Sequence, residues 1–328
     1  MAELYEKVVV VTKQTPLEEL IARLGTPGQA RFYLHQEAAR AAADGNADAA
    51  PRFEEYAAED AAYQTARAAV RVALGKTRAQ WVDRALLPTF TFGERDLVVT
   101  LGPDGLVVNT AKYLRGQPIV AINPDPARVD GVLLPWSVAG AQTGLTRALT
   151  RPLPRKTITM AQARLQNGQR LLAVNDLFIG RKTHASARYR LHFGDSTETQ
   201  SSSGIIVSTG AGSTGWLRSL AVGAAGLAGA FTGEPVPDAA ETAQAARFAW
   251  DKPRLRFCVR EPWLSRANGA ALVAGNIGSG DTLLVVSQMP QNGVIFSDGV
   301  EEDYLPFDSG AVAHIGIAAE QTTLLCPA

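Results

Sequence analysis

Compact apolar runs, separated by segments with helical periodicity, make up the first part of the chain. Three runs, EKVVVVTK, RDLVVTLG and QPIVAINP, have the length of strands and few polar interruptions, which is typical of strands covered on both faces of a parallel sheet. Thr15-Pro16 and Thr26-Pro27 each place a capping hydroxyl before a proline, which indicates the start of a helix. The alternation of strands and helices predicts a doubly wound α/β domain over residues 1–145.

The segment between the first and second apolar runs is rich in Ala, Arg and Glu. Residues 29–84 carry apolar side chains such as Tyr63 and Val70 at helical spacing, and Gly45 and Pro51 interrupt the pattern. We therefore predict two or three helices over this segment. Their alanine-rich faces favour a scaffold role over an interface or a lid.

The pattern of the chain changes at about Lys156. From there on, short apolar or alternating segments are separated by Asn-Gly, Asp-Gly and Gly-Ser-Gly, which are typical of hairpin turns. The pattern predicts an all-β second domain over residues 146–317. The expected fold class is thus α/β followed by all-β, with a boundary near residue 145.

Composition and charge narrow the class of function. Of the 328 residues, 46% are hydrophobic and 20% are charged, as in ordinary globular proteins. The 32 Lys and Arg residues balance 32 Asp and Glu residues, so no overall field attracts nucleic acid or an anionic membrane, and we expect neither partner. The apolar runs are too short to span a bilayer, and MAELYEKVVVVTK lacks the character of a signal peptide, so we expect a cytoplasmic protein.

The cysteines and histidines give no indication of a metal site held by the protein alone. Cys258 and Cys326 are far apart in the sequence, which fits a reducing compartment and predicts neither a disulfide nor a zinc site. The four histidines form no pair at metal-ligand spacing. We therefore expect no metal-binding cluster among the side chains.

The first candidate functional residue lies where the second apolar run ends, in the stretch LGPDGLVVNTAKYL. Asp104 lies there between Gly102-Pro103 and Gly105, at the junction of a predicted strand and a predicted helix. Aspartate is common in turns and at helix caps. The same junction is also where nucleotides bind in α/β folds. Asp104 is therefore either a structural turn residue or a group that acts on a bound nucleotide.

Two further clusters lie in the β-rich part. In SSSGIIVSTGAGSTGWLRSL, an apolar strand leads into a turn of small residues over 209–215. Its backbone N–H groups and hydroxyls can bind an anionic or sugar group, and a flexible connection is the alternative. In AVNDLFIGR, Asn175-Asp176 interrupts an apolar strand. Buried polar groups need partners, so this pair either caps a bend or faces a ligand.

Other phosphate-binding and catalytic motifs fit the sequence poorly. LGKT, residues 74–77, is similar to the end of a Walker loop, but Val70 occupies the position of the required first glycine. No Gly-x-Gly-x-x-Gly follows a predicted strand. AGSTG is similar to the elbow of a serine hydrolase, with Ser213 as nucleophile and His314 as base. It lies in the β-rich part, however, whereas that elbow needs a parallel sheet.

Taken in order, the three clusters resemble the motifs of the NAD kinase family. That family is known for a Gly-Gly-Asp-Gly-Thr loop, an Asn-Glu pair and a Thr-Pro-Thr-Gly-Ser-Thr-Ala-Tyr turn. The matching stretches are GPDGL at 102–106, ND at 175–176 and TGAGSTGW at 209–216. SSSGIIVSTGAGSTGW and REPWLSR are similar to the mitochondrial-type branch and its bacterial relatives, and VIFSDGV resembles a late β segment of the family. The resemblance covers most of the chain.

The resemblance implies a fold, an assembly and a reaction. The α/β domain would be followed by a β-sandwich-like domain, and a tail of about residues 318–328 would return to the first domain. A homo-oligomer, either a dimer or a tetramer, is implied. The implied reaction transfers the γ-phosphoryl group of ATP to the 2′-hydroxyl of the adenosine ribose of NAD(H), with Mg²⁺, and gives NADP(H).

The resemblance also implies roles for individual residues. Asp104 would be the general base, a role that contributes roughly 10²–10⁴-fold in rate. Gly102 and Gly105 would let the backbone approach the phosphates. Asn175 and Asp176 would hold ribose hydroxyls of the acceptor. The other residues implied to bind the acceptor, with Trp216 in the place of the family's tyrosine, are Ser203, Thr209, Gly212, Ser213, Thr214 and Trp216.

The sequence departs from the family's motifs at several positions, of which the change of Glu to Asp176 is mild. Pro103 removes one N–H group from the first loop, and Leu106 stands there in place of a threonine. Ser203 occupies the position of an acceptor-binding aspartate, and Ala211 that of a threonine. Two alternatives follow from these differences. One is a non-catalytic NAD(P)-binding or sensing protein that kept the fold, and the other is a family kinase that acts on another hydroxyl, such as that of a sugar or nucleoside.

Overall fold

The computed structural model describes residues 4–43 and 52–327. The described residues within 1–113, 117–155 and 324–328 form one compact unit, unit 1, and residues 114–116 and 156–323 form a second, unit 2. Gly45 and Pro51, which the sequence pattern predicts as interruptions between helices, lie outside the described residues.

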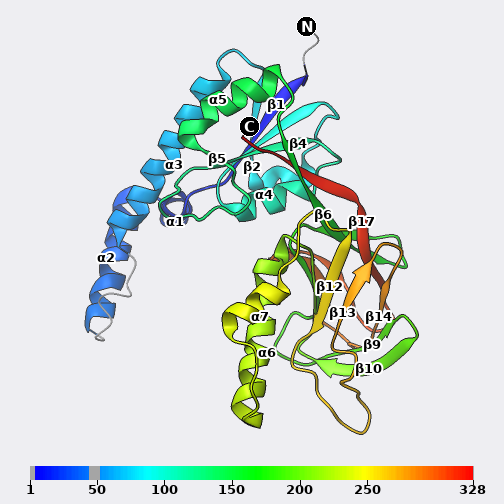
Figure 1. Ribbon diagram of the computed structural model, residues 1–328. Helices are drawn as coiled ribbons and strands as arrows, with labels where there is room; N and C mark the ends of the chain where they lie inside the picture. The colour runs from blue at the N-terminus through cyan, green and yellow to red at the C-terminus, as the bar shows by residue number, and fades with distance from the viewer. Residues whose placement is uncertain (1–3, 44–51, 328) are drawn as a thin grey trace. The chain divides into compact units, whose positions relative to one another are not determined.

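Unit 1 consists of parallel strands and the helices that connect them (Figure 1). Its strands are β1 (Lys7–Thr12), β2 (Ala79–Asp83), β3 (Asp96–Leu101), β4 (Pro118–Asn123) and β5 (Trp136–Ser137). Its helices are α1 (Pro16–Leu24), α2 (Pro27–Ala43), α3 (Phe53–Leu74), α4 (Asp104–Ala111) and α5 (Val138–Thr150), with a 3-10 helix over Arg84–Thr89. The strands follow the order β2-β1-β3-β4, all parallel, and β5 pairs with the end of β4.

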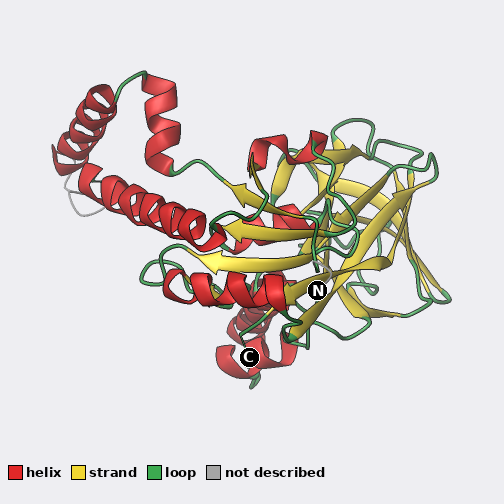
Figure 2. Cartoon of the chain, turned by 90° about the horizontal axis from the view of Figure 1, so that it is seen from above, coloured by secondary structure: helices red, strands yellow, loops and turns green. Residues whose placement is uncertain are grey.

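The valines of β1 show why this sheet is covered on both faces. Val8 to Val11 are each 0% exposed. Alternate side chains of a strand point to opposite faces, so a strand of consecutive apolar residues needs cover on both. Helices α3 and α5 cover one face, where Tyr63 and Leu145 lie in the same buried cluster as Val8 and Val10. Figure 2 shows helices beside the strands of this unit.

The Thr-Pro pairs begin helices, as their sequence predicts. The Thr15 hydroxyl accepts the N–H of Glu18, and the Glu18 carboxylate accepts the N–H of Thr15, which together form a capping box in front of α1. Thr26 accepts the N–H of Gln29 in the same way at the start of α2.

Strand β2 lies where the sequence pattern predicts helix. The segment AQWVD pairs in parallel with β1, although it falls within the 29–84 segment. It contains no run of β-branched residues, and Val82 is its one buried side chain. Pairing with β1, rather than local pattern, therefore makes it a strand. The predicted helices of this segment are confirmed as α2 and α3.

Unit 2 contains two antiparallel sheets. The first has the order β13-β12-β11-β8-β15-β16. The second contains β10-β9-β14-β17, with β6 paired to β17 and β7 paired to β6. The strands are β6 (Arg155–Leu165), β7 (Arg170–Ala173), β8 (Asp176–Arg181), β9 (Ala187–Phe193), β10 (Ser196–Ser202), β11 (Ile205–Ser208), β12 (Arg254–Val259), β13 (Ala274–Gly278), β14 (Leu283–Ser287), β15 (Gly293–Ser297), β16 (Val300–Pro306) and β17 (Val312–Leu325).

The connection from β11 to β12 carries the helices of unit 2. It consists of a short 3-10 turn over Gly212–Thr214, then α6 (Trp216–Thr232) and α7 (Ala239–Ala246). Among residues 4–43 and 52–327, no helix is long and apolar enough to cross a membrane.

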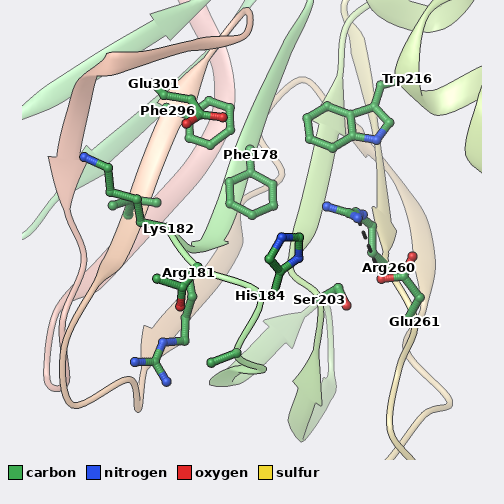
Figure 3. A pocket seen from close by; sticks show the side chains of 13 residues that line it. Phe178, Arg181, Lys182, His184, Ser203, Trp216, Arg260, Glu261, Phe296 and Glu301 are labelled. Atoms are coloured by element: carbon green, nitrogen blue, oxygen red, sulfur yellow. Dashed lines mark ion pairs between the residues drawn. The ribbon is translucent and has the colours of Figure 1, made fainter. Parts of the chain in front are cut away.

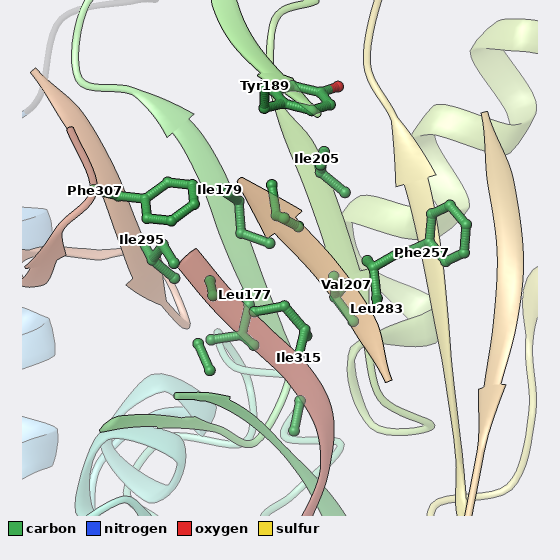
Figure 4. Close-up of a cluster of buried hydrophobic side chains, with 14 of the residues drawn as sticks. Leu177, Ile179, Tyr189, Ile205, Val207, Phe257, Leu283, Ile295, Phe307 and Ile315 are labelled. Atoms are coloured by element: carbon green, nitrogen blue, oxygen red, sulfur yellow. The ribbon is translucent and has the colours of Figure 1, made fainter. Parts of the chain in front are cut away.

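The two sheets of unit 2 enclose one hydrophobic core (Figure 4). Leu177, Val207 and Phe257 enter it from the first sheet, and Tyr189 and Leu283 from the second, and all five are buried. This sandwich of sheets and the parallel sheet of unit 1 confirm the predicted fold class of α/β followed by a β-sandwich-like part.

The core also determines which side chains of β8 face away from it, on the outer face of the first sheet. Leu177 and Ile179 of β8 point into the core, so Asp176 and Phe178 point to the opposite, outer face of the first sheet. Ile206 and Phe296 lie in the same outer cluster as Phe178. The outer face of this sheet is where the site described below is found.

Tyr63 links the carboxyl ends of two parallel strands and gives a test of the packing in unit 1. The side chain is 4% exposed, and burial raises its pKa to about 12. The hydroxyl donates to the Leu101 carbonyl at 3.1 Å and accepts the Lys13 N–H at 3.2 Å. Tyr63→Phe removes this partner from both main-chain groups, so we expect the free energy of unfolding to fall by about 1–3 kcal/mol.

Urea unfolding of the full chain measures this effect. Tyr33 is 37% exposed and contacts Arg23 through the face of its ring, which Tyr33→Phe keeps, so this variant is the matched control and should change the stability by less than about 0.5 kcal/mol. Equal unfolding midpoints for the two variants would contradict a bridging role for Tyr63.

Candidate functional site

The Asn175-Asp176 pair lies at a break between two strands. Strand β7 ends at Ala173 and β8 begins at Asp176, so the expected continuous strand bends over 174–175. Asp176 is 8% exposed and Asn175 is half-buried. Within the described residues, neither side chain forms a hydrogen bond. Two polar side chains that are partly withdrawn from water and have no protein partner are suited to bind a ligand.

The Thr209–Thr214 turn is built directly onto this loop. The Thr209 N–H donates to the Asn175 carbonyl at 2.9 Å, and the Thr209 hydroxyl donates to the Val174 carbonyl. Gly212 lies so close that a Cβ atom added to it would be 2.1 Å from the Asn175 carbonyl oxygen. Only glycine fits this approach. Two clusters that are far apart in the sequence therefore form one surface.

The hydroxyls of Ser213 and Thr214 are used within the turn. Ser213 is 0% exposed, and its hydroxyl donates to the Gly210 carbonyl at 2.7 Å and accepts the Phe248 N–H at 3.3 Å. A substrate cannot reach this oxygen, so the hydrolase reading with Ser213 as nucleophile is wrong. The Thr214 hydroxyl lies 3.5 Å from the Ala211 carbonyl.

A pocket of about 400 Å³ opens on the outer face of the first sheet, and its lining includes Phe178, two residues after Asp176, and Trp216, two residues after Thr214 (Figure 3). Phe178 forms its aromatic wall with Trp216, at 5.8 Å between ring centroids and 6° between planes, and with Phe296, at 4.7 Å. Gly204 lies under the Phe178 ring, because an added Cβ would be 2.8 Å from it. Ser203 also lines the pocket. Such a wall of rings suits a planar aromatic ligand.

Charged side chains surround the aromatic wall. Figure 3 shows Arg260 pointing toward Trp216, with its guanidinium carbon 5.2 Å from the ring centroid. Arg260 also forms an ion pair with Glu261 at 3.7 Å. Lys182 and His184 line the same pocket. These donors suit a ligand that carries anionic groups beside its planar ring.

Asp176 has an unusual protonation equilibrium. Burial and, second to it, the neighbouring Asp298 carboxylate together raise its pKa from the ordinary 3.8 to about 7. The Asp298 side chain in turn accepts main-chain N–H groups from the 174–176 loop. A buried carboxyl group that changes charge near neutral pH is characteristic of functional sites.

The GPDGL loop of unit 1 follows β3 and begins α4. Asp104 is the first residue of this helix, and its two carboxylate oxygens accept the N–H groups of Leu133 at 2.8 Å and Val132 at 3.2 Å. The Gly102 N–H donates to the Ile122 carbonyl at 3.3 Å. Within the described residues, the N–H groups of Asp104 and Gly105 stay available at the start of α4. They can bind an anion there.

The side chain of Leu106 changes the shape of this loop. A Cβ atom added to Gly102 would be 2.8 Å from the Leu106 side chain, so Leu106 covers Gly102. Gly105 is exposed and has no atom within 4 Å of its added Cβ position. A phosphate can therefore approach the backbone at Gly105 but not at Gly102.

A second cavity, of about 240 Å³, lies at the carboxyl ends of the parallel strands of unit 1. Lys13 follows β1, Pro103 follows β3 and Asp125 follows β4, and all three line it. The chain leaves β1 toward one side of the sheet and β3 toward the other. Ligands of α/β proteins commonly bind at such a switch point.

The predicted site residues thus fall into two groups. Gly102, Asp104 and Gly105 belong to unit 1. The other predicted residues belong to unit 2, where the structure brings them together around the 174–176 loop and the aromatic pocket: Asn175, Asp176, Ser203, Thr209, Gly212, Ser213, Thr214 and Trp216.

Residues that the sequence pattern did not single out complete the site. Phe178, Arg260 and Phe296 line the pocket beside Trp216. Period-two alternation along β8 was a usable signal for Phe178, because it places that ring on the same face as Asp176. Asp298 occurs in VIFSDGV, where Asp-Gly predicts only a hairpin turn.

Comparison with solved structures defines the class of fold, with 136 matching chains. A crystal structure of an NAD kinase from Archaeoglobus fulgidus in complex with ATP matches at a TM-score of 0.53 and 14% identity, covering 97% of this chain and 93% of that one. Yeast NADH kinase complexed with NADH matches at a TM-score of 0.56 and 12% identity, covering 99% of this chain and 84% of that one. The chain therefore has a fold like that of NAD kinases, which confirms the fold that the motifs imply.

The sequence comparisons add nothing to this result. No protein-family model matches the chain, and no curated protein matches it significantly. The similarity to the mitochondrial-type branch stays a prediction.

The contact between Gly212 and Asn175 gives a test of how the site is assembled. Gly212→Ala forces a methyl group against a main-chain carbonyl, which has little room to move. We expect the free energy of unfolding to fall by about 2 kcal/mol or more. Urea unfolding measures the change.

Gly223 provides the matched control. It lies within α6, and its added Cβ would have no atom within 4 Å. Gly223→Ala should therefore raise stability by up to about 1 kcal/mol, since alanine is the better helix former. A Gly212→Ala protein as stable as the Gly223→Ala protein would disprove the close approach.

Proposed function

We propose that the chain is an NAD kinase-like phosphotransferase, which moves the γ-phosphoryl group of ATP to the 2′-hydroxyl of the adenosine ribose of NAD or NADH. The observation that carries this proposal is the single surface formed by the Asn175-Asp176 loop and the Thr209–Thr214 turn beside an aromatic pocket. Fold likeness to one kinase bound to ATP and another bound to NADH supports the choice of both substrates.

The acceptor is assigned to unit 2. Asn175 and Asp176 have free hydrogen-bonding atoms for the hydroxyls of a ribose. The ring of Trp216, stacked with Phe178, offers a flat apolar surface to a base, which we assign to the adenine end. Arg260 supplies a positive charge in the same pocket for the phosphates of the dinucleotide.

The phosphates of the donor are assigned to the start of α4. The free N–H groups of Asp104 and Gly105 point out of the helix N-terminus, where the helix dipole favours negative charge. Lys13 in the neighbouring cavity adds a cation at the same edge of the sheet. These groups compensate in part for the N–H that Pro103 lacks.

The family resemblance also implies Mg²⁺. Among the residues that the structure describes, no group of three or more His, Cys, Asp or Glu side chains could hold a metal. Mg²⁺ is commonly held by one or two carboxylates together with substrate phosphates. Asp125 lines the unit 1 cavity, but its carboxylate is ion-paired with Arg128, so it would hold the ion only after giving up that pair. The bound ion would neutralise charge on the phosphates.

The chemical step needs a base and correct positioning. Asp104 would accept the proton of the 2′-hydroxyl while the ribose oxygen bonds to the γ-phosphorus. The bond from the γ-phosphorus to the β–γ bridging oxygen breaks, and ADP leaves. Asn175 and Asp176 would contribute by holding the ribose in one orientation, which lowers the entropy cost of the transfer.

A second candidate function is a non-catalytic dinucleotide-binding protein. One observation favours it: both oxygens of Asp104 already accept main-chain N–H groups, from Val132 and Leu133. Both carboxylate oxygens are thus engaged by the main chain of the 129–134 loop rather than left for a substrate hydroxyl. On this alternative, Asp104 anchors the 129–134 loop and unit 2 binds the dinucleotide without turnover.

An activity assay decides between the two candidates. The purified chain is incubated with ATP, Mg²⁺ and either NAD or NADH, and the product is read with an NADP-specific dehydrogenase. We expect NADP(H) to form, and we expect each dinucleotide to raise the melting temperature, because a ligand that binds the folded state stabilises it. Stabilisation without product would favour the binding protein, and neither stabilisation nor product would overturn both candidates.

Asp104→Asn tests the role of the carboxylate. If Asp104 is the base, this variant should lower kcat by at least about 100-fold and leave the dissociation constant for NAD and the urea midpoint nearly unchanged. Asp195, an exposed turn residue of unit 2, provides the control, since Asp195→Asn removes the same charge away from the site.

A loop anchor would give the opposite result. The urea midpoint would fall with Asp104→Asn because the Val132 and Leu133 N–H groups lose acceptor strength, while turnover changed little. That outcome would remove Asp104 from the chemical step.

A further inference from the structure

Asp298 joins the end of β15 to the loop that carries the candidate acceptor residues. Its Oδ1 accepts the N–H groups of Asn175 at 2.7 Å and Asp176 at 3.2 Å, and its Oδ2 accepts the N–H of Val174 at 3.1 Å. Its own N–H donates to the Asp176 carbonyl at 2.9 Å. One residue thus binds three consecutive main-chain N–H groups of the loop.

The backbone of Asp298 is adapted to this position. Its φ angle is 56°, in the left-handed region that glycine, asparagine and aspartate tolerate best, and Gly299 follows it. An Asp-Gly turn alone would not need contacts more than 120 residues away in the sequence. The three N–H groups hold the carboxylate in one position against the loop.

The Asp298 carboxylate is the charged group that acts on Asp176. Burial and this negative charge together raise the pKa of Asp176 to about 7. Asp176 pairs with Ser208 on β11, and Ser208 pairs in turn with Arg256 on β12. The Arg256 guanidinium donates to the Asn276 side chain and to two carbonyls of α7. The Thr209–Thr214 turn that packs on the loop carries no charged side chain.

We propose that Asp298 is a positioning residue of the acceptor site: its carboxylate fixes the main chain of the Asn175-Asp176 loop and places a negative charge beside the Asp176 carboxyl group. This inference rests on the proposed function, because it takes Asp176 to be a ligand of the ribose hydroxyls. Asp298 itself does not contact the substrate.

The two protonation states of Asp176 bind a ribose differently. An ionised carboxylate accepts hydrogen bonds from two ribose hydroxyls, whereas the protonated acid has one proton to donate and weaker acceptor atoms. The affinity for the dinucleotide should therefore increase as Asp176 loses its proton. With a midpoint near pH 7, the ionised fraction increases about tenfold between pH 6 and pH 8.

Asp298→Asn tests the proposal, since asparagine tolerates the positive φ and keeps one acceptor oxygen but removes the charge. Calorimetric titration with NAD at pH 6, 7 and 8 should show an affinity increase of about tenfold in the original chain and of less than about threefold in the variant. Asp308→Asn is the matched control. Asp308 also binds a main-chain N–H, that of Gly293 at 2.9 Å, and its loss should leave the tenfold increase in place.

Direct titration of Asp176 separates this inference from the proposed function. ¹³C NMR of the aspartate carboxyl groups, assigned with Asp176→Asn, should show the Asp176 midpoint fall by at least one pH unit in Asp298→Asn. An unchanged midpoint overturns the inference even if NAD is phosphorylated. A chain that binds no dinucleotide overturns the proposed function, and the NMR midpoint then still decides whether Asp298 sets the charge of Asp176.

Asp176→Asn gives a further check that does not depend on the folding of the Asp298 variant. Without a titrating group at position 176, the affinity for NAD should be the same at pH 6 and pH 8. If the tenfold increase persists, a group other than Asp176 causes it, and the proposal is wrong.

Discussion

The approach of the Gly212 main chain to the Asn175 carbonyl is the constraint on which the site in unit 2 depends. Because glycine has no side chain, the turn at Gly212 can pack directly against the main chain of the 174–176 loop. This packing brings the Thr209 N–H and hydroxyl to the carbonyls of that loop. The Asp298 carboxylate accepts the main-chain N–H groups of the same loop. The loop is therefore fixed by its main chain, which leaves the Asn175 and Asp176 side chains free for a ligand.

The closeness of two carboxyl groups in this loop lowers the stability of the folded chain, as is common at functional sites. Two carboxyl groups, those of Asp176 and Asp298, lie close together, and Asp176 is nearly buried. Because the pKa of Asp176 is higher in the folded chain than the ordinary 3.8, its contribution is most favourable at low pH and is lost as the pH rises from about 4 to about 7. A leucine of similar size would avoid this loss, but it could not bind a hydroxyl group.

The sequence pattern predicted the parts of the fold that local chemistry determines. The β1 valines, the Thr15 cap and the short strands after Lys156 each follow from propensity and periodicity. Strand β2 and the role of Asp298 could not be predicted, because both depend on partners distant in the sequence. For the same reason, Asp104 could be identified as a candidate, whereas its hydrogen bonds to Val132 and Leu133 could not.

The hydrogen bond from the Trp136 indole to the Leu325 carbonyl, at 2.7 Å, has a consequence for how the chain folds. Leu325 is buried in unit 1, and the Cys326 N–H donates to the Pro154 carbonyl, yet both residues follow the whole of unit 2 in the sequence. On the ribosome, most of unit 1 is synthesised before unit 2, but it lacks these residues until unit 2 has been synthesised. The Trp136 indole therefore gains its hydrogen-bond acceptor only after unit 2 has been synthesised, and unit 1 can complete its fold only then.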